Sequence, residues 1–442
     1  MNLLHSANSQ LIARSLSAVW HPCSQMKHYE QFPLLPIATG SGVWLYDYDG
    51  KRYLDAVSSW WVNLFGHSNS RINAALVEQL NTLEHVMLAG FTHEPVVQLS
   101  ERLRDLAPKG LGHCSYASDG ASAIEIALKM SVHFWRNQNQ PQKTQFISLK
   151  NSYHGETVGA LSVTDVAIFR DAYAALIRQQ ATVMSPDSRD AAAGETAEQF
   201  AVRCADALEL YLQQHHHQLA ALIVEPLVQG AAGMSMYPPV YLSRARALCT
   251  QYGVHLIADE IAVGMGRTGT MFACEQAGIT PDFLCLSKGI TGGYLPLSVV
   301  MTCDEIYAAF YANDTARGFL HSHSYTGNPL ACRAALATLD IFAQDDVIAK
   351  NRATAAYLQH TAAALRAHAA VKNWRNTGMI WAFEVASPHP DFAQRCHRLG
   401  LDNELLLRPI GNTIYFMPPY VISESEIDFL LAKTLHLVQQ LS

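Results

Sequence analysis

The sequence predicts an α/β protein built on a mostly parallel sheet, with a large domain and a smaller α+β domain. Three observations support this prediction. Short apolar runs alternate with amphipathic helical patterns through the middle of the chain, as parallel strands covered by helices require. Each of the four best strand candidates ends at a polar or charged residue. The chain has 442 residues, more than the roughly 100–200 of one ordinary domain. We place the large domain at residues 60–335 and the small one at residues 1–59 with 336–442.

Four apolar runs are the strand candidates, and the residues that follow them matter for function. Open α/β sheets bind ligands beyond the carboxyl ends of their strands. Side chains that follow these runs are therefore the first candidates for a site. The runs occupy residues 146–149, 220–224, 255–258 and 283–286.

Two helix starts are marked by capping residues. Ser423 followed by Glu426 matches a capping box, and apolar residues at helical spacing come after it. Asn328 followed by Pro329 matches an N-cap with a first-turn proline. We expect a C-terminal amphipathic helix and a long helix that links the two domains.

Charge and cysteine usage exclude several classes of protein. The chain has 31 Lys and Arg against 38 Asp and Glu, a net charge of −7, so we expect no nucleic-acid partner. Nine cysteines without a CxxC pair are typical of reduced thiols in the cytoplasm. We see no signal peptide and no continuous spanning segment, and we expect no membrane partner. The run His215-His216-His217 lacks the ligand spacing of a zinc site, so it is interpreted as a loop and no metal is expected.

Asp259 and Lys288 are the most informative pair. Each follows a predicted strand, so both side chains are expected at one edge of the sheet. A lysine at the end of an apolar strand is costly unless it is paired, deprotonated or covalently occupied. Pyridoxal phosphate would explain both residues, because its aldehyde binds a lysine and its ring nitrogen needs a carboxylate. A structural ion pair is the alternative.

A phosphate-binding turn and an aromatic side chain would complete such a site. Residues 118–122 (SDGAS) precede a helical run, and the N–H groups at a helix start bind dianions. Tyr153 follows the strand that ends at Leu149 and could stack on a planar ring. A simple helix cap and a core tyrosine are the respective alternatives.

Residues 264–269 (GMGRTG) match the GxGxxG pattern of dinucleotide-binding proteins. A single match is weak support. The acidic pair Asp259-Glu260, in the predicted strand just before it, would place negative charge beside a pyrophosphate, and the motif does not open a βαβ unit. An NAD-dependent dehydrogenase is therefore kept only as a rival hypothesis.

Taken together, these motifs resemble the class III, fold type I aminotransferases over nearly the whole chain. The Asp259 block with residues 264–269, the block 288–293 (KGITGG) and the block 321–329 (HSHSYTGNP) occur in the order of that family. The resemblance implies a pyridoxal-phosphate enzyme with a large sheet domain and a small α+β domain. It also implies a homodimer with shared active sites.

The resemblance assigns roles to residues of the cofactor site. Lys288 would hold the cofactor and transfer the proton, Asp259 would pair with its ring nitrogen, and Tyr153 would lie against the ring. These three form the expected catalytic set. Ser324 would reach the cofactor phosphate of a partner subunit. The expected phosphate-side contacts are completed by Gly120, Ala121 and His323.

Within the family the chain is most similar to the biotin-pathway branch, which implies amination of 8-amino-7-oxononanoate to 7,8-diaminononanoate. Trp60, with Trp61 nearby, would wall an apolar tunnel, and Arg408 would bind the distal carboxylate. Without the resemblance, core packing and a surface ion pair would be preferred for these residues. The expected substrate contacts are Trp60, Tyr153, Lys288, Ser322 and Arg408.

The amino donor is the open part of this interpretation. Cys23 stands where many relatives carry a tyrosine that stacks on the adenine of S-adenosylmethionine. Two further places depart from the common pattern of the family. Ser322-His323-Ser324 replaces Gly-Pro-Thr, and Ala121 replaces a serine. Residues 289–296 resemble a branch that uses lysine as donor. S-adenosylmethionine and lysine both remain candidates. The rival functions are another class III ω-aminotransferase, acting on ω-amino acids, polyamines or ornithine, and an aminomutase.

Overall fold

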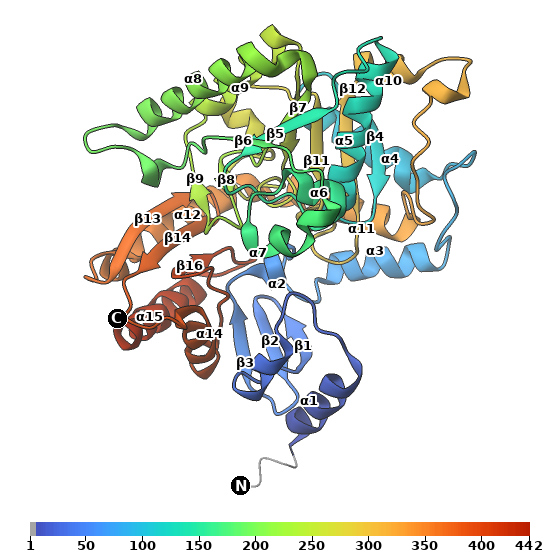
Figure 1. Ribbon diagram of the computed structural model, residues 1–442. Coiled ribbons are helices and arrows are strands. Elements are labelled where there is room, and N and C mark those ends of the chain that lie inside the picture. Colours follow the sequence, from blue (N-terminus) through green and yellow to red (C-terminus); the bar gives the residue numbers. More distant parts are fainter. Residues whose placement is uncertain (1–5) are drawn as a thin grey trace. The chain divides into compact units, whose positions relative to one another are not determined.

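The computed structural model describes residues 6–442 (Figure 1). The chain forms two compact units. The larger unit comprises residues 71–353 and 375–381, and the smaller one comprises residues up to 70 with 354–374 and 382–442. The two units are described separately below.

A seven-stranded sheet forms the centre of the larger unit, with strand order β4-β12-β11-β10-β7-β5-β6. Pairing is parallel from β11 through β6, and only β12 runs antiparallel to its neighbours. β4 therefore points the same way as β11. The strands are β4 (Leu111–Ala117), β5 (Gln145–Leu149), β6 (Ala181–Val183), β7 (Leu219–Val224), β10 (His255–Asp259), β11 (Phe283–Leu286) and β12 (Ser298–Cys303).

The four predicted strands are β5, β7, β10 and β11, and the predicted α/β fold class is confirmed. All residues of β7, β10 and β11 are buried, as central strands covered on both faces require. The register aligns Asp259, the last residue of β10, with Cys285 of β11. The carboxyl ends of these strands consequently reach the same edge of the sheet.

The helix α5 (Gly120–Asn137) packs against β4, β7, β10, β11 and β12. Its apolar face contributes Ile124, Ala127 and Phe134 to a core cluster that also contains Ile257 and Phe283. α8 (Ala197–His215) lies beside α9 (Val240–Tyr252), as Figure 1 shows. The remaining helices of the unit are α3 (Ser70–Leu80), α4 (Glu94–Leu106), α6 (Val158–Val163), α7 (Ala167–Arg170), α10 (Asp304–Phe310), α11 (Pro329–Asp345) and α12 (Val347–Thr361, which continues into the smaller unit).

The smaller unit contains a four-stranded sheet of order β1-β2-β3-β15. A three-stranded sheet has the order β13-β14-β16. The first comprises β1 (Ile37–Ser41), β2 (Trp44–Asp47), β3 (Arg52–Asp55) and β15 (Leu405–Leu406), and the second β13 (Val371–Thr377), β14 (Ile380–Val385) and β16 (Thr413–Phe416). The end of β13 and the start of β14 fall within residues 375–381, which are counted with the larger unit. The helices are α1 (Ala7–Ala18), α2 (Ser58–Trp61), α13 (Ala363–Arg366), α14 (Phe392–Asp402) and α15 (Glu424–Leu441).

Both predicted helix starts are present. The hydroxyl of Ser423 accepts the backbone N–H of Glu426, whose carboxylate accepts the N–H of Ser423, so a full capping box opens α15. The side chain of Asn328 accepts the N–H of Ala331 at 3.1 Å, with Pro329 as the first residue of α11. Local capping chemistry therefore sets both helix starts.

One expectation differs from the structure in detail. The histidine run is helical rather than a loop, since His215 ends α8 and His216 begins a short 3-10 helix, His216–Gln218. The predicted domain limits, 59/60 and 335/336, stay a prediction. The boundaries of the two compact units fall at other residues. The limit 335/336 lies inside α11, which packs on α4. Among residues 6–442, no helix is both long and apolar enough to cross a membrane.

Candidate active site

The candidate site lies where the strands of the large sheet end. Five segments follow the carboxyl ends of β4, β5, β7, β10 and β11, which all point the same way. In open sheets this edge is where ligands bind. The segments after β4, β5, β7 and β11 contribute Gly120, Tyr153, Glu225 and Lys288, and Asp259 is the last residue of β10.

Asp259 is held by a buried histidine. Nδ1 of His154 lies 2.7 Å from Oδ2 of Asp259, and both side chains are almost entirely inaccessible. Oδ1 of Asp259 accepts the N–H of Ile261 at 3.1 Å. The backbone of His154 is fixed in turn, because its N–H donates to Thr164 Oγ1 at 3.0 Å. A carboxylate with both oxygens engaged keeps one orientation, as the partner of a ring nitrogen must.

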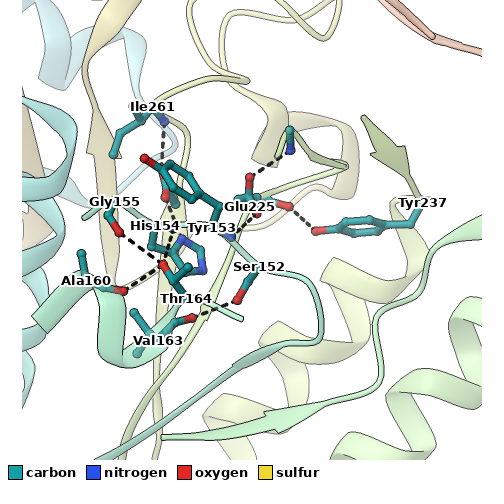
Figure 2. A network of polar contacts seen from close by, with 12 residues as sticks. Ser152, Tyr153, His154, Gly155, Ala160, Val163, Thr164, Glu225, Tyr237 and Ile261 are labelled. Atoms are coloured by element: carbon teal, nitrogen blue, oxygen red, sulfur yellow. Dashed lines mark hydrogen bonds and ion pairs between the residues drawn. The ribbon is translucent and has the colours of Figure 1, made fainter. Parts of the chain in front are cut away.

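Glu225 is a second buried carboxyl group in this network. Its Oε2 accepts the N–H of Tyr153 at 3.1 Å, and its Oε1 accepts the N–H of Gly230 at 3.0 Å. Its backbone carbonyl accepts the hydroxyl of Tyr237 at 2.6 Å (Figure 2). Burial raises the pKa of Glu225 to about 7, and nearby His154 opposes that rise. The site therefore holds a carboxyl group that titrates near neutrality.

Lys288 begins the short 3-10 helix Lys288–Thr291, separated by one residue from the end of β11, and its φ is 46°. Left-handed backbone is uncommon for a residue with a Cβ and is often found at functional sites. Burial lowers the pKa of Lys288, while the negative charges of Asp259 and Glu225 act in the opposite direction. A lysine with a lowered pKa supplies a neutral amine, which is the nucleophilic and basic form.

The start of α5 provides donors for an anion. Asp119 is the N-cap, and its side chain accepts the N–H of Ser122 at 2.9 Å. The backbone N–H groups of Gly120 and Ala121 have no acceptor within the helix, because the first turn never does. Together with the helix dipole, these N–H groups suit a phosphate.

Two glycines allow the loops around this helix start to approach closely. A Cβ on Gly120 would lie 2.9 Å from Cγ2 of Ile261. A Cβ on Gly155, whose φ is +119°, would lie 2.6 Å from Cβ of Ala121. Any larger residue would push apart the loops that follow β4, β5 and β10. The donor set, the carboxylate and the lysine thus fit a phosphorylated pyridine aldehyde.

The other residues expected at the cofactor lie outside the hydrogen-bond network of Asp259 or at its edge. The hydroxyl of Tyr153 donates to Glu156 at 2.9 Å, and its ring meets Phe169 edge-on. Nε2 of His323 lies 3.4 Å from Ser118 Oγ, a long contact beside the start of α5. Ser322 and Ser324 are exposed.

The smaller unit contains the two residues expected to bind the far end of a substrate. Cζ of Arg408 lies 4.1 Å from the ring centroid of Trp60, and Trp60 is 42% exposed. Within residues 6–442, no carboxylate forms an ion pair with Arg408. Trp61 differs, because it is buried and its Nε1 donates to the hydroxyl of Tyr415 at 3.1 Å. Trp61 is thus a residue of the core, whereas Trp60 is not.

Sequence reasoning assigned no role to His154 or Glu225. His154 directly follows Tyr153 in the chain, and nothing else in the sequence marks it. Glu225 carried a clearer signal, because it directly follows the apolar run 220–224. The glycine-rich segment 264–269 follows β10 but forms turns and opens no helix, so it lacks the helix start that dinucleotide binding uses. The dehydrogenase hypothesis therefore loses its structural basis.

This fold and site define a pyridoxal-phosphate-dependent transferase of fold type I. The family model for aminotransferase class III matches residues 25–438. The chain belongs to the class III aminotransferases, and it is a pyridoxal-phosphate-dependent aminotransferase.

Relatives and solved structures agree with this assignment. The chain is 46% identical to adenosylmethionine-8-amino-7-oxononanoate aminotransferase of Helicobacter pylori, over 98% of both chains. It is 40% identical to the enzyme of that name from Geobacter sulfurreducens, over 95% of this chain and 96% of the relative. The crystal structure of the same-named enzyme from Methanocaldococcus jannaschii matches with TM-score 0.92 at 34% identity, covering 98% and 99%. A PLP-bound amine transaminase from an uncultivated Pseudomonas species matches with TM-score 0.91 at 30% identity, covering 96% and 99%.

Proposed function

We propose that this aminotransferase converts 8-amino-7-oxononanoate to 7,8-diaminononanoate in biotin biosynthesis. The names of its relatives, at 34–46% identity over nearly the whole chain, support this substrate. The observation that carries the proposal is the pairing of Arg408 with Trp60. The aromatic ring covers one face of the guanidinium, while its N–H edge is left to bind a carboxylate in bidentate fashion. Such a group suits a substrate with a terminal carboxylate on an aliphatic chain.

The chemical step depends on Lys288 and its neighbours. Pyridoxal phosphate, when bound, supplies the electron sink that makes the carbon bearing the amino group acidic. Nζ of Lys288 would remove the proton from that carbon and hold it for delivery to the carbon on the other side of the nitrogen that is transferred. Asp259 would keep the proton on the ring nitrogen, with His154 holding its carboxylate in place. The N–H groups of Gly120 and Ala121 would bind the phosphate.

The amino donor is proposed to be S-adenosylmethionine, which the relatives' names include. Lysine is the alternative, because Cys23 supplies no aromatic ring for adenine. A half-reaction without acceptor separates the two. Each donor is mixed alone with the cofactor-loaded enzyme, and the absorbance of the bound cofactor is followed. Conversion by S-adenosylmethionine supports the first donor, whereas conversion by lysine alone supports the second.

We further propose a homodimer in the cytoplasm. The exposed Ser324 would contact the cofactor phosphate of the partner subunit. All nine cysteines are free thiols, as is usual for proteins of a reducing compartment. Sedimentation velocity of the loaded enzyme tests the dimer. A monomer with full activity would contradict the shared-site proposal.

A product assay distinguishes this function from its rivals. An ω-transaminase from Thermomicrobium roseum has a similar structure, with TM-score 0.93 at 30% identity, so amine and ω-amino acid substrates form the second candidate function. Formation of 7,8-diaminononanoate from 8-amino-7-oxononanoate, dependent on added donor, is the expected result. Turnover of simple ω-amines with no reaction of the oxononanoate would favour the rival. Product without any donor would favour an aminomutase.

A further inference from the structure

The turn that presents Trp60 has an unusual backbone. Four consecutive residues have positive φ, namely Ser58 at 50°, Ser59 at 47°, Trp60 at 74° and Trp61 at 73°. None is glycine, and positive φ disfavours any residue with a Cβ. In the described part of the chain, no other two adjacent non-glycine residues share this conformation. α2 (Ser58–Trp61) is therefore a left-handed turn that its surroundings must hold.

Asp55, the last residue of β3, supplies much of that restraint. Its Oδ1 accepts the N–H of Ser59 at 3.0 Å and that of Val57 at 3.3 Å. Its Oδ2 accepts the hydroxyl of Ser59 at 2.7 Å. Asp55 is fully buried, whereas Ser59 is exposed, so the bond to Val57 is shielded from water and the two bonds to Ser59 are partly shielded. One carboxylate thus fixes both the backbone and the side chain of Ser59.

His67 provides a further hydrogen-bond partner for Asp55. Its Nε2 lies 3.0 Å from Asp55 Oδ2, and its Nδ1 lies 3.1 Å from the amide nitrogen of Asn63. That amide nitrogen can only donate, so Nδ1 accepts and Nε2 donates to Asp55. His67 is closely packed, since a Cβ added to Gly40 would lie 2.7 Å from the Cβ of His67. The histidine therefore holds Asp55 in a single orientation.

The two ends of the turn are anchored in the interior. The hydroxyl of Ser58 donates to the carbonyl of Met417 at 2.7 Å. Trp61 is buried and bonded to Tyr415. Trp60 alone among these aromatic residues projects outward, against Arg408. Because φ and ψ set the direction of each Cα–Cβ bond, relaxation to right-handed values would move Trp60 away from Arg408.

Backbone strain persists only where neighbouring groups over-determine it, and it clusters at binding sites. Here Ser59 and Trp60 are the accessible residues of the strained turn, and Trp60 stacks on a guanidinium that has no carboxylate partner among residues 6–442. We infer that Asp55 and His67 are positioning residues that set specificity for a distal carboxylate, by holding Trp60 in the left-handed turn against Arg408. The inference rests on the carboxylate-binding role proposed for Arg408.

The first test measures the order of Trp60 without any substrate. Near-ultraviolet circular dichroism is recorded for the cofactor-loaded enzyme and for Trp60→Phe, and the difference gives the Trp60 signal. In an Asp55→Ala background the same difference should shrink by more than half, since the ring loses its fixed setting. Asp47→Ala is the matched control, because Asp47 is also buried, accepts three hydrogen bonds in the same sheet and does not contact the turn. A full Trp60 signal in Asp55→Ala, or an equal loss in Asp47→Ala, would overturn the inference.

The second test uses glycine to replace the restraint. Glycine adopts positive φ without steric penalty, so Ser59→Gly should partly restore the Trp60 signal in the Asp55→Ala background. Asp55→Asn keeps the shape of the side chain and should show a smaller loss in the same direction, which decides the question if Asp55→Ala does not fold. Failure of Ser59→Gly to restore any signal would refute a backbone role for Asp55.

The third test measures specificity. Asp55→Ala should raise KM for 8-amino-7-oxononanoate about 10–100-fold, leave KM for its methyl ester unchanged, and alter the donor half-reaction less than threefold. Equal effects on acid and ester would contradict the inference. If the wild-type enzyme does not prefer the acid to its methyl ester, the carboxylate-binding role proposed for Arg408 is wrong. The circular dichroism signal of Trp60 still decides in that case whether Asp55 and His67 position the Trp60 ring.

Discussion

Nδ1 of His154 lies 2.7 Å from Oδ2 of Asp259, and 105 residues separate the two along the chain. Both side chains are buried, so the contact is not weakened by water. The remaining ring nitrogen of His154 is buried and has no hydrogen-bond partner among residues 6–442. The ring of His154 therefore serves to fix the carboxylate of Asp259 at the end of β10.

Replacement of His154 should weaken cofactor binding. His154→Asn removes a hydrogen bond to a charged group, a loss of about 1.5–3 kcal/mol, so the affinity of the apoenzyme for pyridoxal phosphate should fall about 10–100-fold. Fluorescence titration of the apoenzyme measures this. His255→Asn is the control, because His255 is equally buried at the opposite end of β10 and bonds Ser131. An unchanged affinity in His154→Asn would show that Asp259 needs no such support.

Loss of Lys288 should abolish turnover. Lys288→Ala removes the amine that binds the cofactor and moves the proton, so activity should fall at least about 10³-fold without added amine. Lys150→Ala, at an exposed lysine, should retain wild-type activity. Steady-state rates with each donor provide the measurement. Substantial activity of Lys288→Ala without added amine would contradict the proposed mechanism.

Because burial lowers the pKa of Lys288, cofactor loading should depend on pH. The neutral amine is the reactive form, and its fraction increases as the pH rises through the pKa of the folded protein. The rate at which apoenzyme binds pyridoxal phosphate should therefore increase with pH, with a midpoint below the 10.5 of an ordinary lysine. Stopped-flow absorbance gives the profile. A midpoint at or above that value would show that Asp259 and Glu225 outweigh the effect of burial.

Glu225 should make stability depend on pH. Burial raises its pKa from 4.5 to about 7, so the folded apoenzyme binds this proton more tightly than the unfolded chain does. The resulting stabilisation is complete below about pH 4.5 and is lost as the pH rises to about 7. Relative to Glu225→Gln, the wild type should lose about 3 kcal/mol of unfolding free energy over that range.

Urea unfolding of both proteins at several pH values tests the Glu225 prediction. Glu260, whose pKa is also raised to about 7, is present in both proteins and cancels from their difference. Glu101→Gln, at an exposed position, should give a difference that does not vary with pH. A constant difference between wild type and Glu225→Gln would mean that Glu225 stays ionised throughout.

Lys143 should stabilise the amino end of the large sheet. Its Nζ donates to the carbonyls of His216, Leu219 and Gly253 at 2.7–3.2 Å and lies 4.4 Å from the ring centroid of Trp135. Lys143→Met leaves these carbonyls without their donor, so the unfolding free energy should fall by about 1.5–3 kcal/mol. Thermal and urea unfolding measure the loss. A change below about 0.5 kcal/mol, the range of an exposed variant such as Lys150→Met, would contradict this role.

Much of the architecture is determined by local sequence. Four buried strands follow from continuous apolar runs, and the starts of α11 and α15 follow from capping residues one to three positions away. Asp259 and Lys288 could be placed at one edge because parallel strands carry their carboxyl ends together. These inferences need only the periodicity of the backbone and the chemistry of adjacent residues.

The rest was decided by tertiary structure. No spacing in the sequence predicts that His154 and Glu225 enclose the Asp259 end of β10, because three separate strands bring them together. The left-handed turn at residues 58–61 is equally hidden, since Ser-Ser-Trp-Trp has no intrinsic preference for positive φ. Hydrogen bonds from Ser59 to the buried Asp55, a residue of the preceding strand, impose that conformation only once the sheet has formed. The sequence alone thus determined the strands, the helix caps and the edge at which the chemistry lies. The orientation of the groups at that edge depends on hydrogen bonds between distant segments, which exist only in the folded chain.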